Sequence, residues 1–387
     1  MSMIGADAAV LGDELVSPAW IEVAGDQIVA AGVGPAPGAV DIAVPGIVVP
    51  GFVDQHCHGG NRGDFFAGRA DAALVGAELH RRHGTTTLVA SLVTASQPDL
   101  IEQIRALAPL VDDGTFAGIH LEGPWLSHHR CGAHDPALLR APEPAEVAAL
   151  IDAGGGRIIM ATIAPELPGV IAAIEQMTAA GVVAAVGHTD CSADQARRAV
   201  DSGATVATHL LNQMPAIHKR VGGPVVALLD DPRVTVELIP DGVHVDPALV
   251  GFLVRSLGPD RVAAVTDAMG AAGAPDGDYR IGALDVVVSG GVANLAGGGP
   301  LAGSTLTMDR ALRTLVHDCG IPIEIASALT SRTPAAAMGL ADRGRIAAGM
   351  RADLVVLEPT MLQLTQVMWA GQWQDQTAPE GSAAVHR

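Results

Sequence analysis

Aromatic side chains are scarce in this chain. They make up 3% of its 387 residues, so Val, Ile, Leu and Ala must pack most of the core. Apolar residues are nevertheless 49% of the chain and charged residues only 17%, which is ample for a large buried core. At this length, the usual architectures are a large α/β barrel with an accessory domain or two separate α/β domains.

Positive charge is also in short supply. The chain has 23 Lys and Arg residues against 42 Asp and Glu residues, which gives a formal net charge of -19. Such an acidic surface argues against nucleic acids and anionic membranes as general partners. An anionic ligand would need basic groups that are concentrated locally.

Cysteine pairs and long apolar runs are missing as well. The four cysteines, Cys57, Cys131, Cys191 and Cys319, form no Cys-x-x-Cys pair, and a chain of this size does not need disulfides for its stability. No apolar run is long enough to span a bilayer, and the N-terminus lacks the pattern of a signal peptide. We therefore expect a cytoplasmic protein.

Two kinds of segment alternate between Gly51 and Met338. Short runs rich in Val, Ile and Thr are typical of buried parallel strands, and the segments between them have helical spacing. The expected strands are 47–54, 85–92, 116–121, 157–163, 182–187, 205–209, 234–239 and 261–266, and the expected helices include 98–111, 169–180, 193–202 and 247–257. About eight βα units predict an α/β fold of the (β/α)8 TIM-like barrel type.

The two ends of the chain have a different pattern. Residues 20–29 alternate as strands do around a Gly25-Asp26 turn, and residues 344–357 repeat that character. Neither end can bury both faces of a sheet alone, so we expect 1–46 and 342–387 to form one small β-sandwich domain. The catalytic barrel would then span 47–341, with a β insertion around 279–297. The polar tail after Trp373 is expected to be poorly ordered.

Two histidines follow the first expected strand of the barrel. Side chains two positions apart on a strand share a face, so His56 and His58 should both point into the barrel mouth. Two imidazoles held in this way make half of a metal site. Cys57, between them, should point to the opposite face and pack there.

Further polar residues end other strands. Glu122 ends the third strand, His188 the fifth, His209 the sixth and Asp267 the eighth. Barrel enzymes place their chemistry at these C-terminal strand ends, and buried acids and imidazoles there would be unfavourable without a cation. Any one of them can be an ordinary polar group of the core, but six aligned residues favour a metal site. The nitrogen and oxygen ligands suit one or two divalent ions, with Zn favoured over Fe(II), Co or Mn.

Several motifs resemble those of known enzymes. The His56-x-His58 pair and Asp267 are similar to the amidohydrolase superfamily and, within it, nearly the whole chain resembles the family of N-acetylglucosamine-6-phosphate deacetylases. The motifs that carry this second resemblance are His120-Leu121-Glu122-Gly123-Pro124, Gly187-His188-Thr189, Thr208-His209-Leu210-Leu211-Asn212-Gln213-Met214, Asp241-Gly242-Val243-His244, Thr266-Asp267-Ala268 and Leu301-Ala302-Gly303-Ser304.

The resemblance implies a role for each metal-site residue. Glu122, His188 and His209 match the metal ligands that the family shares, and Glu122 takes the bridging place that a strand-four lysine has in most amidohydrolases. His56 and His58 match a pair that lets some members hold a second ion. Asp267 matches the general acid and base, and it also counts among the expected metal ligands. The implied reaction is attack of metal-activated hydroxide on the acetamide of N-acetyl-D-glucosamine 6-phosphate, which yields glucosamine 6-phosphate and acetate.

The resemblance also implies substrate contacts and a homodimer. An arginine suits a phosphate because its planar group donates two hydrogen bonds, although Arg220 can equally be a solvated surface charge. Gln213 departs from the family, which more often has Ala there. The expected contact residues are Ala133, His134, Asn212, Gln213, Arg220, Asp241, His244, Leu301, Ala302 and Gly303.

Three alternatives stay open at this point. The chain can be an amidohydrolase for a different N-acetyl sugar phosphate, or one for a cyclic amide such as a dihydroorotase. The third is a catalytically silent binding module with the same fold. The dihydroorotase is disfavoured because 157–163 contains no lysine, and the silent module because the ligand set is complete. Cys131 is expected to be a loop residue without a catalytic role.

Overall fold

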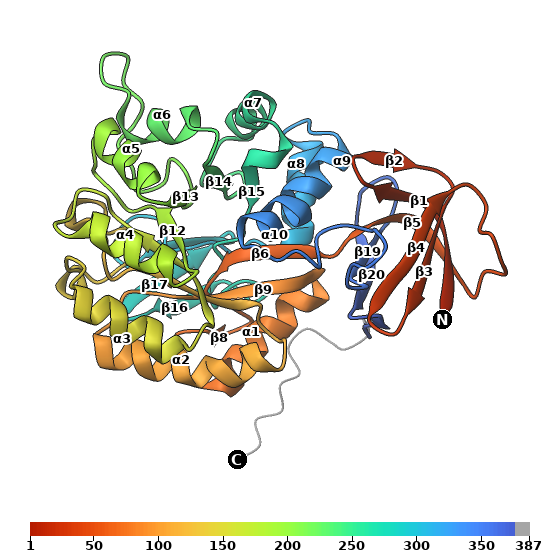
Figure 1. The fold of residues 1–387 in the computed structure, drawn as a ribbon, viewed down its shortest axis with the longest axis horizontal. Coiled ribbons are helices and arrows are strands. Elements are labelled where there is room, and N and C mark those ends of the chain that lie inside the picture. Colours follow the sequence, from red (N-terminus) through yellow and green to blue (C-terminus); the bar gives the residue numbers. More distant parts are fainter. Residues whose placement is uncertain (376–387) are drawn as a thin grey trace.

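Eight parallel strands form the larger part of the molecule, which is a computed structural model that describes residues 1–375 (Figure 1). A bridge between Cys57 and Ala268 links the first strand to the segment after the last one, so the ring nearly closes. This barrel confirms the predicted fold class. In the order of the chain, its strands are β6 (Phe52–Cys57), β9 (Thr85–Leu92), β10 (Gly118–Glu122), β11 (Ile158–Ile163), β12 (Val183–Val186), β13 (Ala204–Ala207), β14 (Thr235–Leu238) and β15 (Val262–Ala264).

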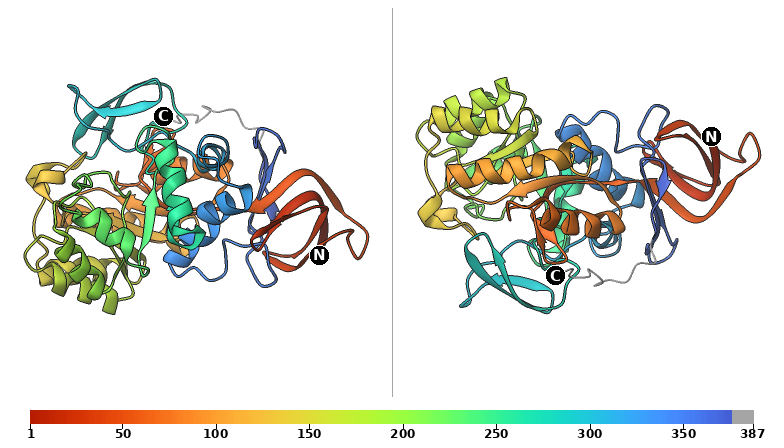
Figure 2. Two further views of the ribbon diagram at one scale, coloured as in Figure 1. Left: turned by 90° about the horizontal axis from the view of Figure 1, so that it is seen from above. Right: turned by 90° about the horizontal axis from the view of Figure 1, so that it is seen from below.

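Helices cover the outside of the barrel (Figures 1 and 2). Because helices lie on one face of the strands and core side chains on the other, the strands are buried on both faces, and every residue of β6 and β9 is buried. The helices are α1 (Ala70–Arg82), α2 (Gln97–Asp112), α3 (Pro144–Gly154), α4 (Val170–Ala179), α5 (Ala193–Asp201), α6 (Gly223–Asp230), α7 (Pro247–Leu257), α8 (Met308–His317), α9 (Ile323–Ser327) and α10 (Thr333–Ala337), with a π-helix at Ala328–Arg332.

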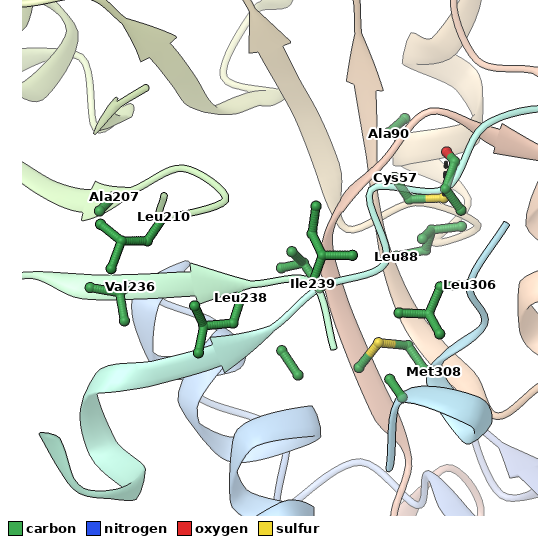
Figure 3. Packing of buried hydrophobic residues seen from close by; sticks show 14 of the residues in the cluster. Cys57, Leu88, Ala90, Ala207, Leu210, Val236, Leu238, Ile239, Leu306 and Met308 are labelled. Carbon is green, nitrogen blue, oxygen red and sulfur yellow. Dashed lines mark hydrogen bonds between the residues drawn. The ribbon is translucent and has the colours of Figure 1, made fainter. Parts of the chain in front are cut away.

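Aliphatic side chains fill the core, as the scarcity of aromatic residues requires. Figure 3 shows Leu88 of β9, Val236 and Leu238 of β14 and Leu306 within one buried cluster. The few large aromatic residues are used at single places. Phe65 and Phe116, for example, meet edge to face with their ring centroids 4.9 Å apart.

The first barrel strand differs from the prediction of 47–54. Residues up to Pro50 belong to β5 (Ile42–Pro50), a strand of the other sheet, and β6 begins only at Phe52. The prediction was wrong because the apolar run continues across the boundary without a polar residue. Gly51 marks the passage, since a Cβ atom there would lie 2.2 Å from Thr86 Oγ1.

A second sheet is built from both ends of the chain, as predicted, and it lies beside the barrel (Figure 1). It packs around its own cluster, which includes Ile4, Ile21 and Leu354. Residues 376–387, on which most of the predicted poorly ordered tail falls, lie outside the described residues, and the predicted domain bounds stay predictions. Its strands are β1 (Ser2–Leu11), β2 (Glu14–Val16), β3 (Ala19–Ala24), β4 (Gln27–Val33), β5, β19 (Leu354–Leu357), β20 (Leu364–Trp369) and β21 (Gln372–Trp373).

A small antiparallel sheet follows the last barrel strand. It consists of β16 (Gly277–Ile281), β17 (Leu284–Ser289) and β18 (Val292–Leu295), and Figure 2 shows it standing out from the barrel. Two very short strands, β7 (Gly59–Gly60) and β8 (Gly63–Asp64), pair just after β6. Among the helices of residues 1–375, none has the length and apolar character that crossing a membrane requires.

Candidate active site

The predicted site residues lie where the barrel strands end. Glu122 is the last residue of β10, while His188 and His209 each lie two residues beyond β12 and β13. His188, His209 and Asp267 have positive φ angles of 44°, 26° and 48°. Such angles are uncommon for residues with a side chain, and they concentrate at functional sites, where the surrounding structure enforces them.

The first set of side chains, here called the Glu122 group, consists of Glu122, His188 and His209. Glu122 Oε1 lies 3.2 Å from His188 Nε2 and 3.0 Å from His209 Nε2, and the two Nε2 atoms are 3.0 Å apart. All three residues are buried. Three electron-pair donors therefore converge on one point.

The second set, here called the strand-one group, consists of His56, His58 and Asp267. Asp267 Oδ1 lies 3.5 Å from His56 Nε2 and 3.3 Å from His58 Nε2. Glu122 Oε2 is also only 3.0 Å from His58 Nε2, so the carboxylate of Glu122 stands between the two groups. The structure thus brings together all six side chains expected at the metal site.

The outer ring nitrogens decide what these histidines present to the centre. His188 Nδ1 lies 2.7 Å from the carbonyl of Arg130, and His58 Nδ1 lies 3.1 Å from the carbonyl of Ser91. A carbonyl oxygen only accepts, so each Nδ1 carries the proton and each Nε2 keeps a free electron pair toward the centre. His56 is held in the same way, because its Nδ1 lies 3.0 Å from a carboxylate oxygen of Glu237. Imidazole electron pairs and carboxylates that face one another fit one or two divalent cations.

His134 lies close to Glu122 but has the opposite polarity. Its Nδ1 accepts a hydrogen bond from the backbone N–H of Thr94 at 3.3 Å, so its Nε2 carries the proton. That N–H group points to Glu122 Oε2 at 3.3 Å. Although its distance alone would allow a place among the ligands, His134 is a hydrogen-bond donor toward the cavity.

Both carboxylates of the site favour the ionised form. Burial alone would raise the pKa of Glu122 and Asp267, but as long as no cation is bound, a positive charge on His56 and hydrogen bonds from protonated neighbouring histidines outweigh burial and lower both pKa values. A bound cation would replace those protons and leave the Nε2 electron pairs free to ligate it. Glu122 and Asp267 are therefore negatively charged near neutral pH. Such charges suit a metal ligand and a proton acceptor.

A cavity of about 280 Å³ opens over these groups. Gly132, Ile281 and Pro300 also line it, although no motif of the sequence predicted them there. Ile281 belongs to β16, so the small antiparallel sheet forms part of the cavity wall. The expected site residues that line the cavity are His58, Glu122, Ala133, His134, His188, His209, Asn212, Gln213, His244, Asp267, Leu301 and Gly303.

Four expected residues do not line this cavity. His56 and Ala302 are fully buried, and Asp241 accepts a hydrogen bond from His244 Nδ1 at 2.7 Å and so orients that ring. Arg220 is exposed, in the segment between β13 and α6, and lies outside the cavity lining. Its predicted contact with the substrate stays a prediction.

Glu237 on β14 is a site residue that the sequence did not reveal. Its carboxylate lies 3.0 Å from His56 Nδ1 and accepts hydrogen bonds from the backbone N–H of His209 at 3.1 Å and from Gln55 Nε2 at 2.7 Å. The sequence contained one sign of this role: Glu237 is an acidic residue within the otherwise apolar end of the strand expected at 234–239. A buried charge in a parallel strand needs a partner, and here the partner is a candidate metal ligand.

Removal of the metal is expected to destabilise the protein. A ligand that binds only the folded state stabilises it by about 2.7 kcal/mol when its free concentration is about 100 times Kd. We expect a chelator to lower the free energy of unfolding by about that amount, as measured by denaturant titration. Adding a divalent metal back should restore the original curve. Identical curves with and without chelator would contradict the metal site.

Comparison with known proteins agrees with this geometry. The model of the amidohydrolase family matches residues 47–381. An N-acetylglucosamine-6-phosphate deacetylase of Lysinibacillus sphaericus is 32% identical over 335 residues, which cover 85% of this chain and 86% of the relative. An N-acetylgalactosamine-6-phosphate deacetylase of Escherichia coli O157:H7 is 34% identical over 352 residues, which cover 90% of this chain and 92% of the relative.

Solved structures give a stronger likeness. The crystal structure of N-acetyl-D-glucosamine-6-phosphate deacetylase from Mycobacterium smegmatis has a TM-score of 0.94 and 50% sequence identity, covering 96% of this chain and 100% of that one. An aspartate-to-alanine variant of the same deacetylase, in complex with N-acetyl-D-glucosamine 6-phosphate, also has a TM-score of 0.94 and 50% identity, covering 96% of this chain and 98% of that one.

Proposed function

Since this chain belongs to the amidohydrolase family, we propose that it hydrolyses the acetamide of N-acetyl-D-glucosamine 6-phosphate, releasing D-glucosamine 6-phosphate and acetate. The observation that carries the proposal is the 50% identity, along nearly the whole chain, to a deacetylase named for this substrate. The convergence of the two ligand groups beneath one cavity supports it.

The side chains divide the chemical work between them. When bound, a divalent metal lowers the pKa of water and stabilises developing negative charge. The Glu122 group would hold one ion and the strand-one group a second. Asp267 lines the cavity and is ionised, so its carboxylate would be free to accept a proton from the attacking water and to pass it to the leaving amine.

The sugar phosphate would be held by polar residues that line the cavity. Burial opposes a charge on His244, but the hydrogen bond and the charge of Asp241 raise the pKa of His244. A protonated His244 suits a ligand with a phosphate group. Asn212 and Gln213 also line the cavity, and so does His134 from the loop after β10. Arg220 would add a phosphate contact if its segment approached the bound substrate.

Several finer features belong to the proposal. Zinc is the preferred ion because histidine nitrogens and carboxylate oxygens are its common ligands, with Fe(II), Co and Mn as alternatives. The homodimer and the cytoplasmic location stay predictions. A dihydroorotase activity is disfavoured because β11 contains no lysine.

Turnover assays on three substrates test the function. We expect the metal-loaded enzyme to release acetate from N-acetylglucosamine 6-phosphate with a kcat/KM at least about 10²-fold above that for unphosphorylated N-acetylglucosamine, because groups built to bind the phosphate are left unpaired without it. N-acetylgalactosamine 6-phosphate belongs in the same series, given the 34% identical relative named for it. Equal turnover with and without the phosphate would contradict the proposed substrate class.

A further inference from the structure

A carboxylate outside the expected ligand set lies directly behind the metal centre. Glu237 has no exposed surface, and β14, which carries it, pairs with β15, whose following segment bridges to Cys57 of β6. Its Oε2 atom lies 3.0 Å from His56 Nδ1 and accepts a hydrogen bond at 3.1 Å from the backbone N–H of His209, which follows the neighbouring strand β13. Its Oε1 atom accepts the hydrogen bond of Gln55 at 2.7 Å.

The partner of His56 differs in kind from the partners of the other ligand histidines. His58 and His188 each donate Nδ1–H to a neutral backbone carbonyl, and His209 Nδ1 has no hydrogen-bond partner among residues 1–375. Of these four candidate ligands, only His56 has a carboxylate as the partner of its Nδ1 atom. An ionised acceptor fixes the ring more firmly than a carbonyl does and makes the opposite nitrogen a better metal ligand.

We propose that Glu237 is the positioning residue that makes the strand-one group a metal site. It holds the His56 ring with Nε2 toward Asp267 and His58, and it would supply negative charge behind a cation bound by that group. Occupancy of the strand-one group therefore depends on Glu237, whereas occupancy of the Glu122 group does not. This inference rests on the proposed function, because it assumes a metal-dependent hydrolase with two ion positions.

Gln55 allows the charge of Glu237 to be removed with little change in shape. In Glu237→Gln, the new amide oxygen can still accept from His56 and from the backbone of His209. The new NH₂ group then faces Gln55, whose Oε1 atom is buried and without a partner in the described residues. A flip of the Gln55 amide brings that oxygen round as the acceptor, so Glu237→Gln chiefly removes the charge.

The test is titration of chelator-treated protein with Co²⁺ or Zn²⁺, followed by calorimetry and metal analysis. We expect two ions per wild-type chain. In Glu237→Gln, the strand-one ion should bind about 10–100-fold more weakly, while the affinity of the Glu122 group stays within about threefold. Gln55→Met serves as the matched control, since it removes the contact of Glu237 with Gln55, keeps the contacts with His56 and His209, and should leave both affinities unchanged.

Each other outcome would overturn the inference. A wild-type chain that binds only one ion would contradict it, and so would unchanged metal affinities in Glu237→Gln. Metal binding that is weakened equally at both groups would indicate a general structural role for Glu237. Should Glu237→Gln not fold, Glu237→Asp draws the carboxylate away from His56 and is expected to weaken the same ion, and unchanged binding there would count against the inference. Because the titration uses no substrate, a failure of the proposed function would show separately, as absent acetate release.

Discussion

Replacing Asp267 with asparagine is expected to lower kcat by about 10²–10⁴-fold, the usual contribution of a general acid and base. The amide has almost the same shape but cannot take a proton from water or return one to the amine. Asp267 lines the cavity and lies 3.3 Å from His58 Nε2, so the fold and the ion of the Glu122 group should survive the change. Steady-state kinetics and metal analysis of the same preparation measure both effects.

A matched control is available at the rim of the barrel. Asp278 is exposed on β16 and outside the cavity that holds the two ligand groups. Asp278→Asn should therefore leave kcat unchanged. Near-normal turnover by Asp267→Asn would remove Asp267 from the proton transfer. Loss of all bound metal in that variant would mean that it acts as an essential ligand instead.

Glu122→Gln is expected to have a second large effect, on both ions at once. One carboxylate oxygen lies 3.0 Å from His209 Nε2 and the other 3.0 Å from His58 Nε2, so Glu122 serves both groups. The amide lacks the charge, and its NH₂ end cannot ligate a metal. We expect metal content to fall to near zero and turnover to fall by about 10³-fold or more, since metal catalysis contributes several kcal/mol.

The control for Glu122→Gln is Glu102→Gln on the exposed face of α2, which should change neither metal content nor turnover. The outcomes expected for the two active-site variants also differ. Asp267→Asn should be inactive with metal bound, and Glu122→Gln inactive without it. A Glu122→Gln protein that kept two ions would show that the carboxylate does not join the two groups.

Regular elements were predictable where polar residues mark their ends. The expected helix at 247–257 and the expected strand at 85–92 agree with the bounds of α7 and β9. The prediction of the first barrel strand was wrong because residues 47–53 form one apolar run in the sequence. In the structure, β5 ends at Pro50 and β6 starts at Phe52. Only pairing with β1 and β19 assigns β5 to the other sheet, and pairing partners do not show in local sequence.

The convergence of the six candidate ligands was predictable because polar residues that follow apolar strands stand out in the sequence. The backbone conformation of these residues was not predictable. β13 ends at Ala207, and His209, two residues later, has a positive φ angle. The contact between Glu237 and His56 joins residues 181 positions apart across the closed barrel, so no local pattern reports it. The location of Arg220 likewise depends on a loop whose course the sequence does not specify.

The most direct test is a crystal structure of the zinc-loaded protein with anomalous data collected at the zinc edge. Convergence of the strand ends on a cation predicts an anomalous peak about 2.0–2.2 Å from the Nε2 atoms of His188 and His209 and from a carboxylate oxygen of Glu122. A second peak beside His56 and His58 is expected at full loading. Peaks only at other residues, or none at all in zinc-saturated crystals, would contradict the account.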